Sequence, residues 1–409
     1  MRKTTLITSF LISFTATIVA QTVNTGEIIV TDNTVISFIG DFNNTASGVF
    51  MNDGDAYVYN NWNNEGVVDF FNKGITRFKG DTPQVISGTN TSYLYDIQFD
   101  NTATQNAFEL SGDISLANNS DFSTGIIDNK NFNGNFTFEQ FANHTNATNN
   151  SYIEGLIIKI GNNPFTYPIG DDNFYRYAKI SAPDDVNDNF ISKYFYENPD
   201  ENYPLTSKED IITLVNDQEY WTLIRDIGSS NIIFTLSWDE NTTTPESIIA
   251  LPEEAIHIVR WDETQGLWVD QGGVVDLNAK IVSTPLTLDN YGVFTLARVR
   301  IIPLPDKVVI FNGVSPNDDG ANDYFLIENA HLLANNRVRI YNRWGIQVFD
   351  TKNYDTNNNV FRGYSDGRLT VGKEMLPSGT YFYVLTYDYI TDNSKQSILQ
   401  EGYLYLKTN

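Results

Sequence analysis

The stretch Asp41-Phe42-Asn43-Asn44 returns twenty residues later as Asn61-Trp62-Asn63-Asn64, with aromatic and amide side chains in the same places. At the same step Phe38 is replaced by Val58 and then by Phe78. A period near twenty residues, with short alternating segments between Asn and Gly, is typical of a solenoid whose coils stack on one another. This repeat therefore predicts a solenoid over residues 21–160.

Two further matches extend the repeat. Phe50-Met51-Asn52-Asp53-Gly54 is followed by Phe70-Phe71-Asn72-Lys73-Gly74, and Ile97-Gln98-Phe99-Asp100-Asn101 is followed by Ile114-Ser115-Leu116-Ala117-Asn118 at an offset of 17. We therefore expect a parallel β-helix-like solenoid in which apolar side chains stack inward and Asn side chains bind the backbone at the corners. The alternative is an ordinary antiparallel sandwich in which these similarities are accidental.

Residues 161–302 lose the repeat, gain prolines and predict a β-sandwich. Ile232, Phe234, Leu236 and Trp238 alternate with smaller or polar residues, as strand residues do. The further predicted strands cover residues 256–261, 267–269 and 291–299, and weak helical patterns cover residues 208–214 and 253–256. The four tryptophans of this region suggest either a sandwich core or a carbohydrate-stacking platform; they are Trp221, Trp238, Trp261 and Trp268.

Residues 1–20 have the composition of a secretory signal peptide. Arg2 and Lys3 precede an apolar stretch from Leu6 to Val19, and Ala20 is the expected cleavage point. The chain has no cysteine, which excludes disulfides, thiolate metal sites and cysteine nucleophiles. The sequence therefore predicts an exported protein that depends on core burial for its stability.

The chain is strongly acidic. It carries 26 Lys and Arg residues against 51 Asp and Glu residues, a formal net charge of −25. Phosphate backbones would be repelled by such a surface, so we expect no nucleic-acid partner.

The last hundred residues carry a series of distinctive motifs. They begin with Phe311-Asn312-Gly313-Val314-Ser315-Pro316-Asn317-Asp318-Asp319-Gly320-Ala321-Asn322-Asp323-Tyr324-Phe325. Tyr341-Asn342-Arg343-Trp344-Gly345, Leu376-Pro377-Ser378-Gly379-Thr380-Tyr381-Phe382-Tyr383 and a closing strand, Gly402-Tyr403-Leu404-Tyr405-Leu406-Lys407, follow in that order. Prolines in Ile301-Ile302-Pro303-Leu304-Pro305-Asp306 indicate a linker before them.

These blocks resemble the gliding-motility-associated C-terminal domain, the type B sorting domain of Bacteroidetes type IX secretion. The resemblance covers residues 303–409 and implies an Ig-like β-sandwich sorting domain. One departure is Phe361-Arg362-Gly363, which stands where the family has Trp-x-Gly. The motif residues are Asn312, Gly313, Ser315, Pro316, Asn317, Asp319, Gly320, Asn322, Asp323, Tyr341, Asn342, Arg343, Trp344, Gly345, Pro377, Gly379 and Tyr381.

The resemblance also implies partners and a location. The chain would engage the type IX secretion machinery and an outer-membrane partner protein, and it would reside outside the cell in association with the cell surface.

Arg343 is expected to lie against an aromatic face.

The loop that follows Pro316 gathers side-chain oxygens around Gly320. Hard oxygen ligands suit Ca²⁺, and Asn317, Asp319, Asn322 and Asp323 are the candidate ligands. The alternative is a tight turn held by Asx hydrogen bonds, with Gly320 at positive φ, and we favour this second interpretation.

Enzyme signatures are absent from the sequence, and we expect no enzyme and no catalytic residue. The three histidines, His144, His257 and His331, fall in three different regions, and no Ser-His-Asp or phosphate-loop pattern occurs. The predicted function is that of an adhesin-like or gliding-motility-associated binding protein with a surface polysaccharide or protein ligand. The alternatives are a structural component of a surface motility or filament complex and a glycan-active enzyme built on the β-helix.

Overall fold

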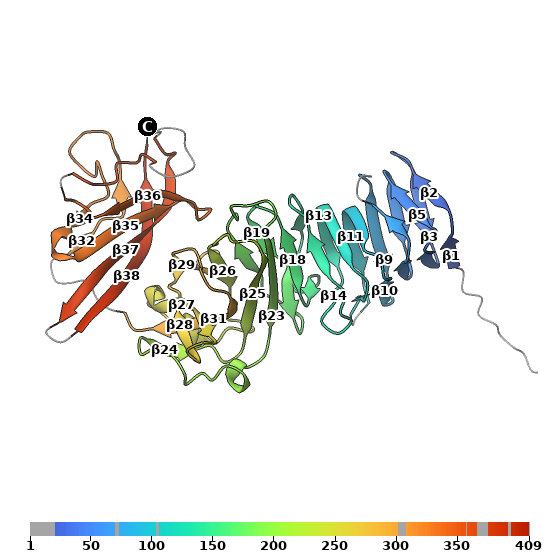
Figure 1. The fold of residues 1–409 in the computed structure, drawn as a ribbon, viewed down its shortest axis with the longest axis horizontal. Coiled ribbons are helices and arrows are strands. Elements are labelled where there is room, and N and C mark those ends of the chain that lie inside the picture. Colours follow the sequence, from blue (N-terminus) through green and yellow to red (C-terminus); the bar gives the residue numbers. More distant parts are fainter. Residues whose placement is uncertain are drawn as a thin grey trace, which may run out of the picture.

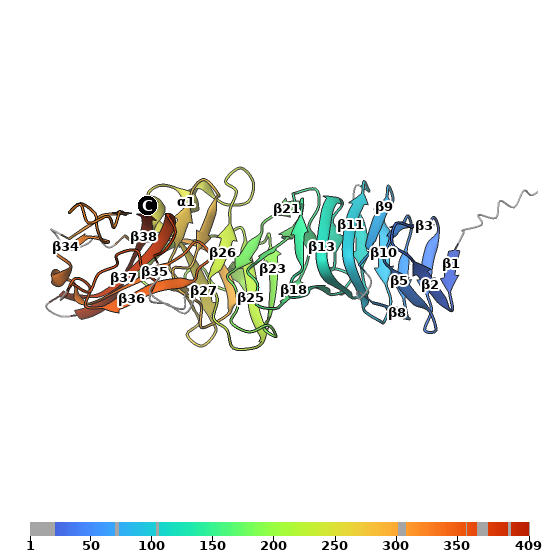
Figure 2. The same ribbon diagram turned by 90° about the horizontal axis from the view of Figure 1, so that it is seen from above.

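The computed structural model describes residues 21–69, 73–103, 106–301, 308–356, 358–365, 375–391 and 394–408. This part of the chain is almost entirely β structure and forms an elongated body, with the solenoid, a middle module and a C-terminal domain following one another (Figures 1 and 2). The all-β prediction is confirmed. The expected signal peptide and residues 302–306 of the expected linker lie outside the described residues.

The N-terminal part is a β-solenoid of about six turns. Its first three coils each contribute one strand to each of three parallel sheets, because alternating side chains let every coil pack against the next. These strands are β1 (Gln21–Asn24), β2 (Glu27–Val30), β3 (Val35–Phe38), β4 (Asp41–Asn44), β5 (Val49–Asn52), β6 (Asp55–Val58), β7 (Trp62–Asn64), β8 (Val67–Val68) and β9 (Ile75–Gly80). The later coils hold β10 (Gln84–Ser87), β11 (Ser92–Asn101), β12 (Phe108–Leu110), β13 (Ile114–Thr124), β14 (Ile127–Asp128), β15 (Phe136–Phe138), β16 (Asn143–Thr145), β17 (Ile153–Glu154) and β18 (Ile157–Ile160).

The twenty-residue repeat is confirmed in the pairing of the first three coils. Phe42 lies beside Trp62, and Phe38, Val58 and Phe78 are stacked in register. All five side chains are buried, so the repeat marks the inward-facing positions of the solenoid.

One predicted alignment is wrong, and another holds only at its end. Phe50 pairs with Val68 and so departs from the predicted step of twenty, whereas Asp55 and Ile75, directly after Gly54 and Gly74, pair at that step. Residues 70–72 of this match lie outside the described residues. Ile97 pairs with Ser120, and Ile114 pairs with Ser92, so the offset of 17 does not describe a coil. Paired residues of neighbouring coils are 22 to 24 positions apart here, because two register shifts in the β11–β13 pair each add one residue.

Stacked asparagines stabilise one corner of the solenoid, as the sequence predicts. The side-chain amide of Asn24 donates to Asn44 over 2.9 Å, and that of Asn44 donates to Asn64 over 2.9 Å. Asn44 and Asn64 are fully buried, and Asn64 also donates to the backbone of Asn90 and Thr91. This row of hydrogen bonds gives partners to buried side-chain amides that could not be paired within a single coil.

The middle module continues the solenoid without a break. Strand β18 begins an antiparallel extension of a fourteen-stranded sheet, which includes β23 (Asn189–Phe195), β24 (Ile212–Val215), β25 (Tyr220–Ile227), β27 (Ile256–Asp262), β28 (Leu267–Asp270) and β31 (Gly292–Val299). Opposite it lies a five-stranded sheet of β19 (Phe165–Tyr167), β22 (Ala178–Ile180), β26 (Phe234–Ser237), β29 (Val274–Asp276) and β30 (Ile281–Ser283). Strands β20 (Ile169–Asp171) and β21 (Phe174–Tyr175) end the first solenoid sheet.

The two sheets of the module enclose a common core. Phe234 of β26 and Phe294 of β31 lie with ring centroids 5.0 Å apart, and both belong to one apolar cluster with the solenoid side chains. The strands predicted at residues 256–261, 267–269 and 291–299 are confirmed as β27, β28 and β31.

Of the two helical segments predicted in the middle module, one is confirmed and the other is wrong. Residues 253–255 form the short 3-10 helix η2 (Glu253–Ala255), whereas residues 212–214 belong to β24, so that helical prediction is wrong. Packing of Ile212 and Val215 into a second apolar cluster overrides the local helical pattern. The described part of the middle module also contains the short helices η1 (Pro199–Glu201) and α1 (Glu246–Ile249).

The four tryptophans of the middle module are core residues. Trp221 and Trp268 are fully buried, and Trp238 and Trp261 expose 6% and 7% of their surface. A carbohydrate-stacking platform needs open ring faces, so that alternative is wrong for these residues.

The C-terminal domain has a separate apolar core. Its main sheet has the order β33 (Gly313–Val314), β38 (Ser394–Leu406), β37 (Gly379–Thr391), β35 (Ala334–Tyr341) and β36 (Gln347–Lys352). A short pair, β32 (Val309–Ile310) with β34 (Ile327–Glu328), and the helix η3 (Ala330–Leu332) complete the described part. The closing strand predicted at residues 402–407 is confirmed as the end of β38, which forms a long hairpin with β37 from the Gly379–Leu406 pair to the Thr391–Ser394 pair.

Candidate functional site

The segment Tyr341–Gly345 is the hairpin turn between β35 and β36. The side chain of Asn342 accepts hydrogen bonds from the backbone N–H groups of Trp344 and Ile346, both over 3.0 Å. Gly345 has φ 76°, which a side chain would disfavour. The turn residues are thus those that its geometry requires.

The exposed part of this turn carries a cation–π contact. The Arg343 guanidinium lies 4.3 Å from the ring centroid of Trp344, which confirms the predicted aromatic contact, and half of Trp344 is exposed. A Cβ at Gly345 would lie 2.7 Å from Cδ1 of Ile233, so the turn packs closely against the middle module.

The loop after Pro316 is held by hydrogen bonds within itself. The Asp323 carboxylate accepts from the backbone N–H groups of Asp318 and Gly320, over 2.7 and 2.9 Å. The Asp319 carboxylate accepts from Ala321 N–H and from the Asn317 amide, over 2.8 and 2.7 Å. These are the contacts of an Asx-stabilised turn.

The backbone of the loop agrees with that interpretation. Gly320 has φ 86°, and Asp318 and Asn322 also have positive φ. The backbone N–H of Ser315 donates to Asn322 O over 2.7 Å and closes the loop. Ca²⁺ binding by Asn317, Asp319, Asn322 and Asp323 stays a prediction; among the described residues no group of three or more His, Cys, Asp or Glu side chains is arranged for a metal ion.

The other motif residues lie around the last strand. Gly313 pairs with Tyr405 in a parallel bridge, and the backbone carbonyl of Asn312 accepts from Tyr405 N–H over 2.7 Å. The Tyr381 hydroxyl donates to Pro377 O over 2.8 Å, and Gly379 begins β37. The structure therefore brings the first and third motifs to the two sides of β38, where Gly313 pairs with Tyr405 and Gly379 pairs with Leu406. The second motif adjoins the third, because Tyr341 at the end of β35 pairs with Phe382 of β37.

The C-terminal domain meets the middle module through β38. The Glu401 carboxylate accepts from Gly273 N–H over 2.6 Å and lies 3.7 Å from His257 Nε2. His257 Nδ1 in turn lies 2.7 Å from Asp270 Oδ1. Two residues further along β38, the Tyr403 hydroxyl donates to Val275 O. A cavity of about 900 Å³ opens beside these contacts.

Burial and neighbouring charges shift the pKa values of Glu401 and His257. Burial raises the pKa of Glu401 to about 7, although His257 and the Gly273 N–H oppose this rise. Burial lowers the pKa of His257, but the charges of Asp270 and Glu401 outweigh it and leave that pKa raised. The second carboxylate oxygen of Glu401 is buried without a hydrogen-bond partner among the described residues. Such a group is costly to ionise.

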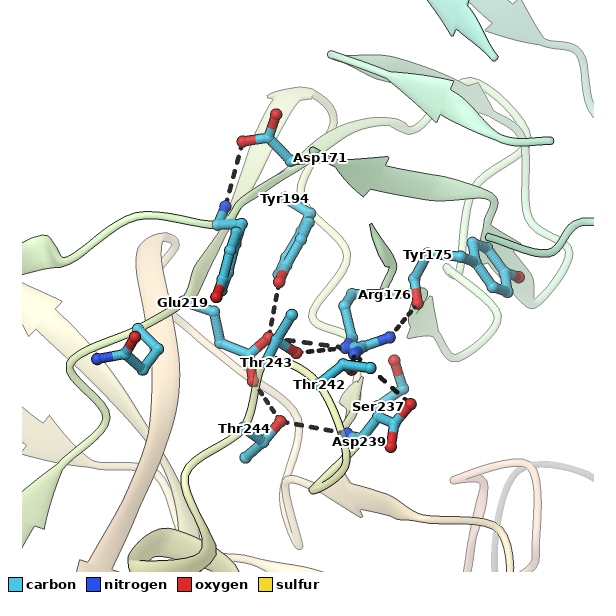
Figure 3. A network of polar contacts seen from close by, with 12 residues as sticks. Asp171, Tyr175, Arg176, Tyr194, Glu219, Ser237, Asp239, Thr242, Thr243 and Thr244 are labelled. Atoms are coloured by element: carbon cyan, nitrogen blue, oxygen red, sulfur yellow. Dashed lines mark hydrogen bonds and ion pairs between the residues drawn. The ribbon is translucent and has the colours of Figure 1, made fainter. Parts of the chain in front are cut away.

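A second polar network lies where the solenoid meets the middle module (Figure 3). The Glu219 carboxylate is fully buried and lies 3.8 Å from Arg176 Nε. It accepts from the hydroxyls of Tyr194, over 2.7 Å, and Thr244. Burial raises the pKa of Glu219 despite these hydrogen bonds and Arg176.

Arg176 links this carboxylate to a loop of the middle module. Its Nε donates to the Thr243 hydroxyl over 2.6 Å, and its Nη2 lies 3.7 Å from Asp239. The backbone carbonyl of Arg176 accepts from the indole of Trp221 over 3.1 Å. Every group here has a structural partner, so the network fixes the junction. Sequence reasoning missed it because no local pattern joins Arg176 to a residue 43 positions away.

A group of carboxylates lies at the last solenoid coils. Lys130 Nζ binds Asp171 over 2.6 Å, and Tyr196 N–H donates to the other oxygen of Asp171 over 3.2 Å. Burial, followed by the charges of Asp171 and Asp128, raises the pKa of Glu154 to about 7. A carboxyl whose pKa lies near neutrality beside a second carboxyl is a feature of acid–base pairs and of structural clusters alike.

The outer surface of the solenoid carries tied rows of polar side chains. Across β6, β9, β11 and β13, Arg77 lies 3.3 Å from Asp55 and donates to Gln98 over 3.0 Å, and Gln98 donates to Asp121 over 2.9 Å. Beside them the rings of Tyr57 and Tyr59 stack with centroids 6.2 Å apart, and Arg77 lies over Tyr57. Tyr59 is 41% exposed. We call Tyr57, Tyr59, Arg77, Gln98 and Asp121 the ladder face.

None of the helices in the described ranges is long and apolar enough to cross a bilayer.

The histidine of the solenoid, His144, makes a structural contact. Burial lowers its pKa to about 4, and its Nε2 lies 3.0 Å from Thr166 O. This ring is therefore not available to bind a ligand at the surface.

Comparison with known proteins gives one match. No curated protein and no solved structure matches the chain. Among family models, that of the CHU_C type IX secretion signal domain matches residues 308–406, which span the C-terminal domain from before β32 to the end of β38. The domain implies export out of the cell and interaction with the type IX machinery. The C-terminal part of this chain is a type IX secretion signal domain.

Proposed function

We propose that the type IX machinery exports this protein to the cell surface, where an outer-membrane partner holds it and its rigid β rod acts as an adhesin. The observation that carries the proposal is the secretion signal domain at residues 308–406, in a chain whose elongated solenoid continues into the middle module without a break in the sheet. The rod is suited to presenting a binding surface away from its attachment point.

The ladder face is the proposed binding surface. Its charged and amide groups hold one another through Arg77 and Gln98, so they would lose little freedom on binding a ligand. The tyrosine rings add apolar area next to hydrogen-bonding groups, a combination that suits a neutral polysaccharide. The acidity of the chain, with a net charge of −25, disfavours acidic polymers.

Deletion of residues 303–409 tests delivery. We expect the truncated protein to accumulate in the periplasm and to be absent from the cell surface, measured by surface labelling and cell fractionation. In-frame deletion of residues 41–60 in the solenoid is the control, and this variant should still reach the surface. Normal surface delivery of the truncated protein would overturn the sorting role.

A retention assay tests adhesion. The purified full chain should bind to films of at least one of cellulose, chitin or agarose, and Tyr59→Ala combined with Arg77→Ala should reduce retention at least fivefold. Phe141→Ala is the matched control, because Phe141 is 74% exposed on the same solenoid outside the ladder face. Equal retention of the double variant and the control would contradict the ladder face as the binding site.

A glycan-active enzyme is the second candidate, favoured by the raised pKa of Glu154 beside Asp171. Both oxygens of Asp171 are already bound by Lys130 and Tyr196 N–H, as in a structural carboxylate, and for this reason we place adhesion first. Release of reducing ends from a mixed polysaccharide panel, abolished by Glu154→Gln, would reverse that order. A structural role in a surface filament or motility complex would instead give one stoichiometric partner when the chain is captured from outer membranes.

A further inference from the structure

The secretion signal domain contacts the middle module by completing an open strand edge. Strand β29 is the last strand of its sheet, so one of its edges has no neighbouring strand in that sheet. On this side the N–H of Gly273, just before β29, is bound by Glu401, and the carbonyl of Val275 is bound by Tyr403. Both partners are side chains of β38.

The spacing of the two contacts is that of a strand pair. Glu401 and Tyr403 are two residues apart, as are Gly273 and Val275, so side chains on one face of β38 follow the two-residue period of the edge that they cover. A carboxylate supplies the acceptor and a phenol supplies the donor that a neighbouring strand would otherwise supply. An uncovered edge would expose these backbone groups to other chains.

The contact also contains groups that change charge near neutral pH. Glu401 has His257, on β27, at 3.7 Å, and His257 has Asp270, on β28, at 2.7 Å. The remaining titratable or charged groups around Glu401 and Tyr403 are carboxylates and one tyrosine: Glu209, Glu253, Glu254, Asp276 and Tyr383. Arg300 lines the same cavity, together with Asp210 and Asp289.

We propose that Glu401 and Tyr403 form a reversible latch, by which the middle module holds the secretion signal domain more tightly in acidic than in alkaline solution. Closing the latch takes Glu401 out of water into a site where its second oxygen has no hydrogen-bond partner among the described residues. Protonation of Glu401 or His257 lowers the repulsion within this carboxylate-rich cluster. The latch concerns the contact between two parts of the chain and does not depend on where the chain is delivered.

The sign of the effect follows from both groups. The Glu401 pKa rises from 4.5 to about 7 in the closed state, so the closed state is favoured in acid and loses that advantage as the pH rises through this window. The His257 pKa is also raised, so its contribution is present below 6.5 and is lost as the pH rises through the raised value. Since each pKa unit is a factor of ten, the closing equilibrium should fall about a hundredfold between pH 5 and pH 8.5.

Two-colour single-molecule fluorescence on the full chain tests the latch. The chain has no cysteine, so Thr264→Cys in the middle module and His331→Cys in the secretion signal domain give two unique labelling sites, both exposed. We expect one transfer-efficiency population at pH 5 and a second, broader one at pH 8.5. A single unchanged population at both values would overturn the proposal.

Two variants separate the latch from a general effect of pH. Glu401→Gln keeps an oxygen for Gly273 N–H but cannot ionise, so the pH dependence should shrink by at least tenfold. Glu328→Gln, an exposed change in the same domain, should leave the pH dependence as in the unaltered chain. Equal pH dependence in Glu401→Gln and Glu328→Gln would contradict the role of Glu401. Tyr403→Phe should favour the open population at both pH values.

Discussion

Single residues at the corners hold the solenoid together. Asn44 donates to Asn64 and accepts from Asn24, and its amide also donates to Val67 O over 3.2 Å. No solvent reaches this side chain, so each hydrogen bond replaces one that water would have made.

We expect Asn44→Ala to lower the free energy of unfolding by about 2–3 kcal/mol, because it removes the buried hydrogen bonds of Asn44 to Asn24, Asn64 and Val67 O. Urea denaturation followed by circular dichroism measures the change. Asn63→Ala is the matched control: Asn63 belongs to a half-buried row on the outer face, where water can take over its bonds to Asn43 and Ser87. If both variants lost less than about 1 kcal/mol, the buried row of Asn24, Asn44 and Asn64 would not be important for stability.

Glu219 should make stability depend on pH. Its pKa is raised above the usual 4.5 by burial, so the folded state holds the proton more tightly than the unfolded state does. The contribution of Glu219 to stability is therefore fully present below pH 4.5 and is lost as the pH rises through the raised pKa. We expect the slope of unfolding free energy against pH between 4.5 and 8 to be smaller in Glu219→Gln, measured by denaturant titration at several pH values. Glu328→Gln should keep the full slope, and an unchanged slope in Glu219→Gln would show that Glu219 does not carry it.

At the scale of elements, the hairpin of β35 and β36 shows how a sequence motif becomes geometry. One Asn side chain binds two N–H groups of the turn, and one glycine takes the positive φ that closes it. We expect Asn342→Ala to destabilise this hairpin by about 1–2 kcal/mol, seen as faster hydrogen exchange across residues 335–352. Arg343→Ala, in the same turn but resting only on exposed Trp344, should change the exchange much less. Equal effects would mean that the Asn342 bonds do not hold the turn.

What the sequence could predict depends on how local the signal is. Phe42 and Trp62 occupy the same inward position in neighbouring coils, so the repeat can be recognised directly in the sequence. The alignment of Ile97 fails because the coil gains residues at a bulge, which leaves no marker in composition. The Arg176–Glu219 and His257–Glu401 pairs join distant segments, so each residue alone looks like an ordinary surface charge.

At the scale of the whole molecule, the first coils of the solenoid form a stack in which each coil pairs its strands with those of the next coil. Deleting residues 41–60 would remove one coil, join Gly40 to Asn61 and place Trp62 where Phe42 lay, since both occupy the same position in the β1–β4–β7 sheet. The Asn ladder would close again, with Asn24 donating to Asn64. We therefore expect a folded rod that is shorter by about 4.8 Å, the spacing of neighbouring strands.

Deleting residues 41–50 is the matched control, because it removes half a coil and brings strands of different sheets into line. Asn52 would then take the inward place of Phe42, and Gly54 that of Asn44, so the apolar stack and the Asn row would both be interrupted. Small-angle scattering should give a slightly smaller longest dimension for the 41–60 deletion, and thermal unfolding should remain cooperative, with a midpoint lowered by the loss of one interface between coils. The half-coil deletion should lose cooperative unfolding of the N-terminal coils. If both deletions unfold alike, the coils are not interchangeable units, and the solenoid must depend on contacts specific to each coil.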